Sequence, residues 1–277
     1  MNQNKDQNVI DDFGREWETF DQSQKPESER LIEFETYFDI FPWENLPPDP
    51  VGFDAGCGSG RWSLLVAPRV KHLYCIEPSN AIEIARRNLH HLQNCSFHKV
   101  SIDEMPFDND SMDFGYSLGV LHHIPDTEKG LTDCVKKLKP GAPFLLYIYY
   151  NFDNKPFWFK SIWKISDLIR KFISRLPFKL KYLLSQCFAL FVYYPFARFS
   201  KLLETFNINV EHIPLSAYRN MSFYRMRTDA LDRFGTKLEQ RFSREQITDM
   251  MKRAGLENIT FSPGVPYWCA VGTKKPG

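Results

Sequence analysis

Long apolar runs and paired cysteines are both missing from this sequence. No apolar run reaches the roughly 18 residues that a membrane-spanning helix needs. The six cysteines are scattered and none belongs to a CxxC pair, which argues against a zinc site or an iron–sulfur cluster, so we predict no metal. Residues 1–12 are polar and lack the apolar core of a signal peptide. These absences favour a cytoplasmic protein with reduced thiols.

Internal repeats, low-complexity tracts and recognised nucleic-acid-binding modules are also absent, so we predict no nucleic-acid partner. The length of 277 residues suits one enlarged domain, or one domain with a cap. The net charge of +1 excludes little, because one segment of the chain is strongly basic and the remainder is acidic.

Short apolar strands alternate with helical segments in the first half of the chain and again near its end. Such alternation implies a parallel sheet with helices on both faces. The expected strands are residues 51–55, 72–76, 96–102, 112–120, 143–149, 257–261 and 268–272. We therefore predict an α/β, Rossmann-like fold, in which a mostly parallel seven-stranded sheet has helices on both faces and carries an inserted helical cap.

The same pattern divides the chain into four parts. Residues 1–46 form an N-terminal cap segment, with a loose helical pattern over residues 29–39. Residues 47–150 form a cofactor-binding core. Residues 151–240 interrupt the alternation as an inserted helical lid or acceptor-binding region, and residues 241–277 complete the core sheet.

The most informative stretch is the turn at the end of the first strand, Val51–Gly60. It places Asp54 before three glycines at alternate positions, Gly56, Gly58 and Gly60. Glycine tolerates positive φ and lets the backbone approach a ligand closely. The acidic side chain can accept hydrogen bonds from a cationic or hydroxylated ligand. The turn alone leaves a dehydrogenase or a ligand-free structural turn open, although a dinucleotide-binding enzyme would prefer G-x-G-x-x-G.

This turn resembles motif I of the class I methyltransferases, which bind S-adenosylmethionine and release S-adenosylhomocysteine. The resemblance covers residues 50–150 and 241–273, and Leu138–Leu146 is similar to the family's LKPGG motif. It implies that the acidic residue and the first two glycines of the turn bind this cofactor. It also implies that Glu77, with Pro78 beside it, accepts the ribose hydroxyls; a solvated loop carboxylate is the alternative.

Two further segments carry the resemblance. Residues 101–107 are similar to the family's third signature, whose aspartate contacts the adenine amino group, but Ser101 holds that position here without a charge. The backbone N–H and apolar side chain of Ile102 are then expected to hold the adenine ring. Ser117–Asp126 resembles the family's post-II segment at the carboxyl end of the fourth strand, where ligands bind in open α/β sheets, and Leu118 is a predicted cofactor contact.

His122 and His123 lie in that post-II-like segment. An imidazole can take a proton from a hydroxyl group near neutral pH, so either histidine is a candidate catalytic base. The alternative is that one of them packs inward and orients the loop.

Phe13–Trp17 resembles a segment that precedes the core in some of these enzymes and folds over the cofactor. The resemblance implies that Arg15 meets the methionine carboxylate of the cofactor and that Trp17 shields its sulfonium. A tail pinned by its aromatic residues is the alternative.

The interrupting segment is basic and aromatic. Residues 155–201 contain ten basic residues and one acidic residue, Asp167. This pattern fits a helical lid that forms the acceptor pocket, a lid that also makes peripheral contact with an anionic membrane, or a pocket for a phosphorylated or nucleotide-linked acceptor. Tyrosine and arginine suit a sugar or carboxylate acceptor, with a surface salt-bridge network as the alternative. The predicted substrate residues are Tyr149, Tyr218, Arg219 and Tyr224.

The sequence therefore predicts an S-adenosylmethionine-dependent methyltransferase for a small-molecule acceptor, with O-methylation of a sugar or glycan precursor as the favoured reaction. A methyltransferase for a lipid or quinone at the membrane surface is the second candidate. A cofactor-binding protein without catalysis, which rests on Ser101 alone, is the third.

Overall fold

The computed structural model describes residues 4–210 and 213–276, and the chain divides into two compact units. Unit 1 comprises Met1–Gln22, Leu31–Asn151 and Leu238–Gly277, and unit 2 comprises Ser23–Arg30 and Phe152–Lys237. The predicted N-terminal segment 1–46 is thus shared between the two units. Within unit 2, Glu29 accepts a hydrogen bond from the backbone N–H of Ser222 at 3.1 Å.

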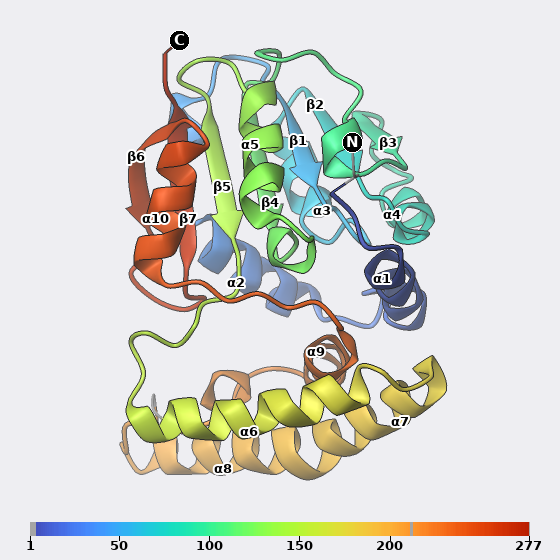
Figure 1. Ribbon diagram of the computed structural model, residues 1–277, viewed down its shortest axis with the longest axis vertical. Helices are drawn as coiled ribbons and strands as arrows, with labels where there is room; N and C mark the ends of the chain where they lie inside the picture. Colours follow the sequence, from blue (N-terminus) through green and yellow to red (C-terminus); the bar gives the residue numbers. More distant parts are fainter. Residues whose placement is uncertain (1–3, 211–212, 277) are drawn as a thin grey trace. The chain divides into compact units, whose positions relative to one another are not determined.

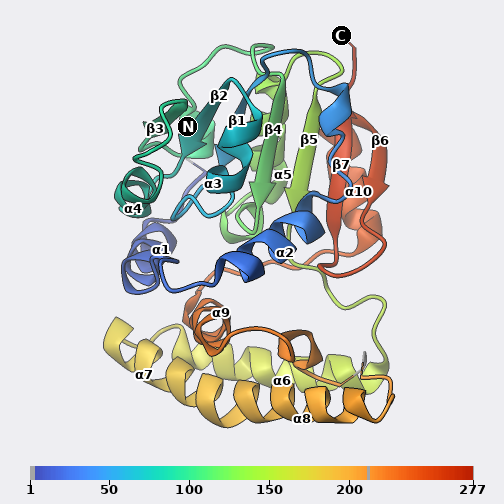
Figure 2. The same ribbon diagram turned by 180° about the vertical axis from the view of Figure 1, so that it is seen from behind.

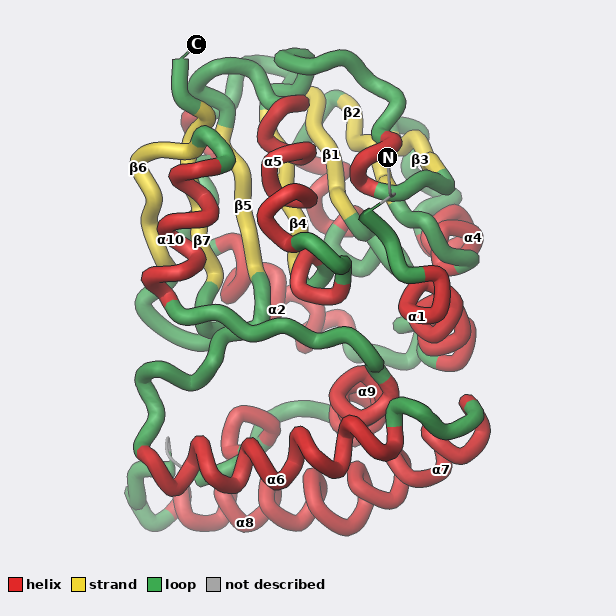
Figure 3. The backbone as a smooth tube through the Cα atoms, viewed as in Figure 1, coloured by secondary structure: helices red, strands yellow, loops and turns green. Residues whose placement is uncertain are grey.

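A seven-stranded sheet forms the centre of unit 1 (Figures 1 and 3). Its strands are β1 (Val51–Ala55), β2 (His72–Ile76), β3 (Cys95–His98), β4 (Phe114–Leu118), β5 (Pro143–Tyr147), β6 (Leu256–Phe261) and β7 (Cys269–Lys274). Their order is β3-β2-β1-β4-β5-β7-β6. Neighbours among the first five strands are parallel, and β7 is antiparallel to both β5 and β6. The predicted Rossmann-like, mostly parallel sheet is confirmed.

Helices cover both faces of this sheet, as Figures 1 and 2 show from opposite sides. On one face α5 (Thr127–Lys137) and α10 (Arg244–Arg253) contribute to an apolar layer. On the other face α3 (Ser63–Val66) and α4 (Ala81–Asn88) contribute to a second layer, together with the end of α2 (Glu27–Phe38). Side-chain caps begin α5 and α10, at Asp126 and Ser243 respectively, and satisfy backbone N–H groups of the first turn.

The strands β3 and β4 are shorter than the ranges 96–102 and 112–120 that the apolar pattern predicts. After β3 the backbone turns into a short 3-10 helix over Ile102–Glu104, which Ser101 and Glu104 cap reciprocally. After β4, Gly119 takes a φ of +80°. Both strands therefore stop where the chain enters the loops at the carboxyl edge of the sheet.

Unit 2 is built from helices. These are α6 (Phe157–Ile173), α7 (Phe178–Phe188), α8 (Tyr194–Thr205) and α9 (Phe223–Gly235), with a π-helical turn over Ala189–Tyr193 between α7 and α8. Met226, Ala230 and Phe234 of α9 form its small core with Ile173 and Tyr193. The predicted lid 151–240 corresponds to Phe152–Lys237, but residues 238–240 belong to unit 1.

Two glycines let β1 and β4 lie together in the centre of unit 1. Gly52 pairs with Phe114, and Gly115 pairs with Phe53, in the register of the two strands. A Cβ on Gly52 would lie 2.3 Å from the Phe114 ring, and a Cβ on Gly115 would lie 2.4 Å from the Phe53 ring. Each glycine therefore provides the space that the opposite phenylalanine fills.

We expect Gly115→Ala to destabilise unit 1 by roughly 1–3 kcal/mol, because the added methyl group overpacks the core against Phe53. The measurement is the urea denaturation midpoint followed by circular dichroism. Gly264→Ala is the matched control, since nothing lies within 4 Å of the Cβ position there. Equal midpoints for the two variants would contradict this account of β1–β4 packing.

Candidate functional site

The carboxyl ends of β1 and β4 lie where the strand order changes direction, which is the usual ligand position in open α/β sheets. The turn after β1 enters this edge with Gly56, Gly58 and Gly60 at φ values of +86°, +53° and +81°. The N–H of Gly56 donates to the carbonyl of Ile76 at 2.8 Å, which ties the turn to β2. A Cβ on Gly56 would lie 2.4 Å from the side chain of Val120. The turn therefore needs glycine both for its conformation and for its packing.

Asp54 lies beneath this turn. Its side chain is 1% exposed and accepts a hydrogen bond from the hydroxyl of Ser63 at 2.7 Å. Burial raises the pKa of the Asp54 carboxyl to about 7, against the opposing effect of the Ser63 bond. The structure thus places Asp54 as a support of the turn, and its direct contact with a cofactor stays a prediction.

Glu77 fixes the middle of the turn. One carboxylate oxygen accepts the N–H of Gly58 at 3.1 Å and the other accepts the N–H of Ser79 at 3.0 Å. Burial raises the pKa of the Glu77 carboxyl, while these hydrogen bonds favour its charged form. Glu77 is therefore not a solvated loop carboxylate. Each oxygen retains a second lone pair that can accept a ribose hydroxyl, and the half-buried Pro78 follows directly.

Helix α1 (Gln7–Thr19) lies beside the turn. The indole N–H nitrogen of Trp17 lies 3.0 Å from the Cβ position of Gly58. Arg15 on the same helix is exposed, and its predicted cofactor contact stays a prediction. The guanidinium of Arg61 lies 5.7 Å from the centroid of the Trp17 ring. Sequence reasoning missed Arg61, although its place directly after the last glycine of the turn was a signal.

The residues predicted to hold the adenine lie at the same edge of the sheet. Ser101 is buried, and its hydroxyl donates to Asp103 and Glu104, each at 2.7 Å. The hydroxyl that replaces the family's aspartate is therefore engaged with two neighbouring carboxylates. Ile102 is buried in the apolar layer, and the side chain of Leu118 packs in the opposite layer.

His122 and His123 are both buried beyond β4. The His122 ring is 0% exposed and lies 3.9 Å from the rings of both His123 and Tyr149, centroid to centroid. Neither ring nitrogen of His122 has a hydrogen-bond partner among the described residues. Burial lowers the pKa of the His122 imidazole well below its usual range, so this ring is neutral near pH 7. The ring of Phe13 in α1 packs against His123 in a tilted arrangement, with a centroid distance of 4.9 Å.

A strap over residues 238–242 holds the histidine loop, and sequence reasoning did not find it. The carbonyl of Leu238 lies 2.7 Å from Nδ1 of His123, and the N–H of Gln240 donates to the carbonyl of His122 at 3.0 Å. Arg241 lies over the Tyr149 ring at 4.9 Å and pairs with Glu239 at 2.8 Å. The strap therefore fixes both histidines and Tyr149 through contacts distant in sequence.

The other predicted substrate residues belong to unit 2 and have partners there. The Tyr218 hydroxyl donates to Asp229 at 2.9 Å, and Arg219 donates to Glu204 at 2.9 Å. Tyr224 lies in α9. This arrangement matches the alternative of a salt-bridge network, and a substrate role for the three residues stays a prediction.

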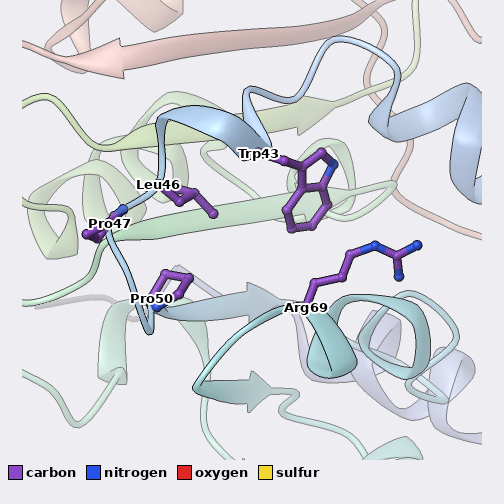
Figure 4. A pocket seen from close by; sticks show the side chains of 5 residues that line it. All are labelled: Trp43, Leu46, Pro47, Pro50 and Arg69. Carbon is purple, nitrogen blue, oxygen red and sulfur yellow. The ribbon is translucent and has the colours of Figure 1, made fainter.

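A hollow lies at the opposite edge of unit 1, before the start of β1. Figure 4 shows the side chains that line it. The guanidinium of Arg69 lies 5.9 Å from the Trp43 ring centroid. The lining residues are Trp43, Leu46, Pro47, Pro50 and Arg69. Because Pro50 precedes the amino end of β1, this hollow is separate from the glycine turn at the carboxyl end.

The described residues contain no group of three or more histidine, cysteine, aspartate or glutamate side chains that could hold a metal ion. Over the same part of the chain, every helix is too short or too polar to cross a membrane.

Comparison with known proteins connects this site to a family. Residues 53–146 match the family described as methyltransferase domain. Over 110 residues the chain is 33% identical to phosphoethanolamine N-methyltransferase 2 of Caenorhabditis elegans, covering 38% of this chain and 25% of that protein. Over 114 residues it is 31% identical to ubiquinone biosynthesis O-methyltransferase of Hahella chejuensis, covering 39% of this chain and 47% of that protein. The chain therefore spans a quarter to about half of the length of these relatives.

A solved structure supports the fold over nearly the whole chain. The complex between the Haloferax volcanii Trm112 methyltransferase activator and a methyltransferase contains a chain with a TM-score of 0.53 and 14% identity. The similarity covers 97% of this chain and 100% of that chain, and at this identity it shows the fold alone.

The sheet, the motifs and the domain match together define the class. Residues 53–146 form a methyltransferase domain, and the sheet has the fold of the class I S-adenosylmethionine-dependent methyltransferases. S-adenosylmethionine is the cofactor of that family, and the site fits it: a glycine turn with left-handed backbone lies next to a buried carboxylate at the switch point of the sheet.

We expect Asp54→Asn to change how stability depends on pH. The pKa of Asp54 is raised from 3.8 to about 7, so the native carboxyl keeps a proton that the unfolded chain has lost. Its contribution is complete below pH ~4 and is lost as pH rises through ~7. The wild type should therefore lose roughly 3 kcal/mol relative to the variant between pH 5 and pH 8.

Asparagine can still accept the hydroxyl of Ser63, so the variant removes the charge and keeps the bond. Urea denaturation at several pH values measures the effect, with the exposed Asp108→Asn as control. Parallel profiles for wild type and Asp54→Asn would show that this carboxyl does not titrate in that range.

Proposed function

We propose that this chain transfers a methyl group from S-adenosylmethionine to a hydroxyl group of a small-molecule acceptor. The carrying observation is the buried pair His122 and His123, packed against Tyr149 at the carboxyl end of β4. Val120, two residues before His122, packs against Gly56 of the glycine turn. The candidate base and the glycine turn that is the candidate cofactor site are thus neighbours within unit 1.

Bound beside the glycine turn, S-adenosylmethionine would supply an electrophilic methyl group on its sulfonium and would leave as S-adenosylhomocysteine. The protein positions the acceptor oxygen in line and receives its proton. His123 is the proposed base, since a proton on Nδ1, donated to the Leu238 carbonyl, leaves Nε2 as the nitrogen that accepts. His122, fully buried between two rings, is proposed to orient this loop.

The acceptor class has two candidates. A sugar or glycan precursor is the first. Its support is the group of Tyr218, Arg219 and Tyr224, of which Tyr218 and Arg219 have hydrogen-bond partners within unit 2. A lipid or quinone is the second, and it is favoured by the exposed apolar side chains of α6. Methyl-labelled S-adenosylmethionine, added with the protein to cell extract, distinguishes the two acceptor classes. A labelled water-soluble product supports the sugar, and a labelled organic-soluble product supports the lipid or quinone.

We expect S-adenosylhomocysteine to bind the wild type, measured by isothermal calorimetry. Trp17→Ala should weaken this binding by roughly tenfold, because loss of a large aromatic contact costs on the order of 1.4 kcal/mol. Trp158→Ala, an exposed tryptophan of unit 2, is the matched control. The proposed function fails if the wild type does not bind at millimolar ligand. Binding without any labelled product would instead support a cofactor-binding protein without catalysis.

We expect His123→Asn to lower turnover by roughly 10²–10⁴-fold, which is the usual contribution of a general base. Its affinity for S-adenosylhomocysteine should match that of the wild type. Asparagine still places an amide donor near the Leu238 carbonyl, so loop geometry is largely retained. The assay is single-turnover transfer to the acceptor identified by labelling. Full turnover in both His123→Asn and His122→Asn would exclude a histidine base.

A further inference from the structure

Helix α6 presents an apolar face to solvent. Trp158, Ile162, Ile165, Ile169 and Phe172 recur every three or four residues and so share one side of the helix. Their exposed fractions lie between 38% and 68%. Large apolar side chains gathered in this way mark an interaction surface.

The opposite side of α6 holds the helix in unit 2 with polar contacts. Asp167, Arg170 and Ile173 are buried there. Arg170 donates to Asp167 at 2.8 Å and to the carbonyl of Thr236 at 2.9 Å. The ion pair between Asp167 and Arg170 lies within α6, and the helix packs on the rest of unit 2 through the hydrogen bond to Thr236 and the buried Ile173. Outward it offers aromatic and aliphatic side chains. This is the reverse of an ordinary surface helix.

The apolar exposure continues along the same unit. In both views the axes of α6 and α8 lie nearly parallel, with the chain running in opposite directions (Figures 1 and 2). The additional exposed apolar residues are Leu180, Leu183, Leu190, Phe191, Phe196, Phe199, Leu202 and Phe206. We call these residues, together with the five of α6, the apolar surface of unit 2.

Unpaired cations accompany this surface. Lys164, Arg175 and Lys179 are exposed and make no ion pair among residues 4–210 and 213–276. The acidic residue of the segment, Asp167, is already bound by Arg170 and Lys171. A second copy docking by a two-fold axis would place this surface against itself, with like charges facing each other. An anionic partner with an apolar layer beneath it satisfies both features.

We propose that the apolar surface of unit 2 binds an anionic lipid membrane, with α6 lying along the interface. The aromatic and aliphatic side chains enter the boundary of the acyl chains, and the cations meet the lipid headgroups. This inference goes beyond the proposed methyl transfer and does not require it, because vesicle binding can be measured without cofactor or acceptor.

The first experiment reverses charge. Full-length protein is sedimented with vesicles of phosphatidylglycerol and phosphatidylcholine in equal parts, and with pure phosphatidylcholine vesicles. The variant Lys164→Glu, Arg175→Glu, Lys179→Glu should partition to the anionic vesicles at least roughly tenfold less than wild type. The matched control Lys71→Glu, Arg87→Glu, Lys252→Glu carries the same charge change on exposed residues of unit 1 and should partition as wild type.

The second experiment removes apolar contact. Ile162→Ser, Ile165→Ser, Phe172→Ser should reduce binding to the anionic vesicles. The control Leu31→Ser, Ile32→Ser, Val265→Ser changes exposed apolar residues of unit 1 and should not reduce it. Circular dichroism shows whether each variant is folded. Equal vesicle binding by wild type and both unit 2 variants overturns the proposal. The proposal is also overturned if the wild type does not bind vesicles but forms a stable dimer, and if only the serine variant of unit 2 dissociates that dimer.

Discussion

The buried carboxylate of Glu77 is the interaction on which the candidate site depends. Charge in a buried position is costly unless hydrogen bonds compensate it, and here the amides of Gly58 and Ser79 do so. The amide of Gly58 can point at Glu77 because the glycine takes a left-handed conformation. The conformation of the turn and the carboxylate of Glu77 at the end of β2 therefore depend on each other. Trp17 lies over Gly58, the glycine that connects the two.

The sequence was sufficient to predict the features that arise from local pattern. Alternating apolar segments predicted the parallel strands, and alternate glycines predicted the turn, since both depend on neighbouring residues. The strap over residues 238–242 could not be predicted in this way. His123 and Leu238 are 115 positions apart, and their bond exists only because the chain returns from unit 2 to the carboxyl edge of the sheet.

The tyrosines and arginines of unit 2 show a related limit. Their composition fitted either a sugar site or an ion-pair network. The ion pairs themselves depend on helix packing, which composition does not reveal. Helix α8 brings Glu204 to Arg219, and Asp229 of α9 accepts hydrogen bonds from Arg225 and from the Tyr218 hydroxyl. Ser101 is similar, because its engagement with Asp103 and Glu104 follows from the 3-10 turn rather than from residue type.

Helical spacing of aromatic residues has opposite consequences in the two units. In α1, Phe13 and Trp17 are one turn apart, and they pack on His123 and beside Gly58. In α6, Trp158 and Phe172 share a face at the same periodicity but remain exposed. The difference lies in the polar residues: Asp167 and Arg170 have partners inside unit 2, so their side of α6 turns inward and the aromatic side turns outward. Aromatic periodicity thus defines a face, and the partners of the polar residues determine whether that face becomes core or binding surface.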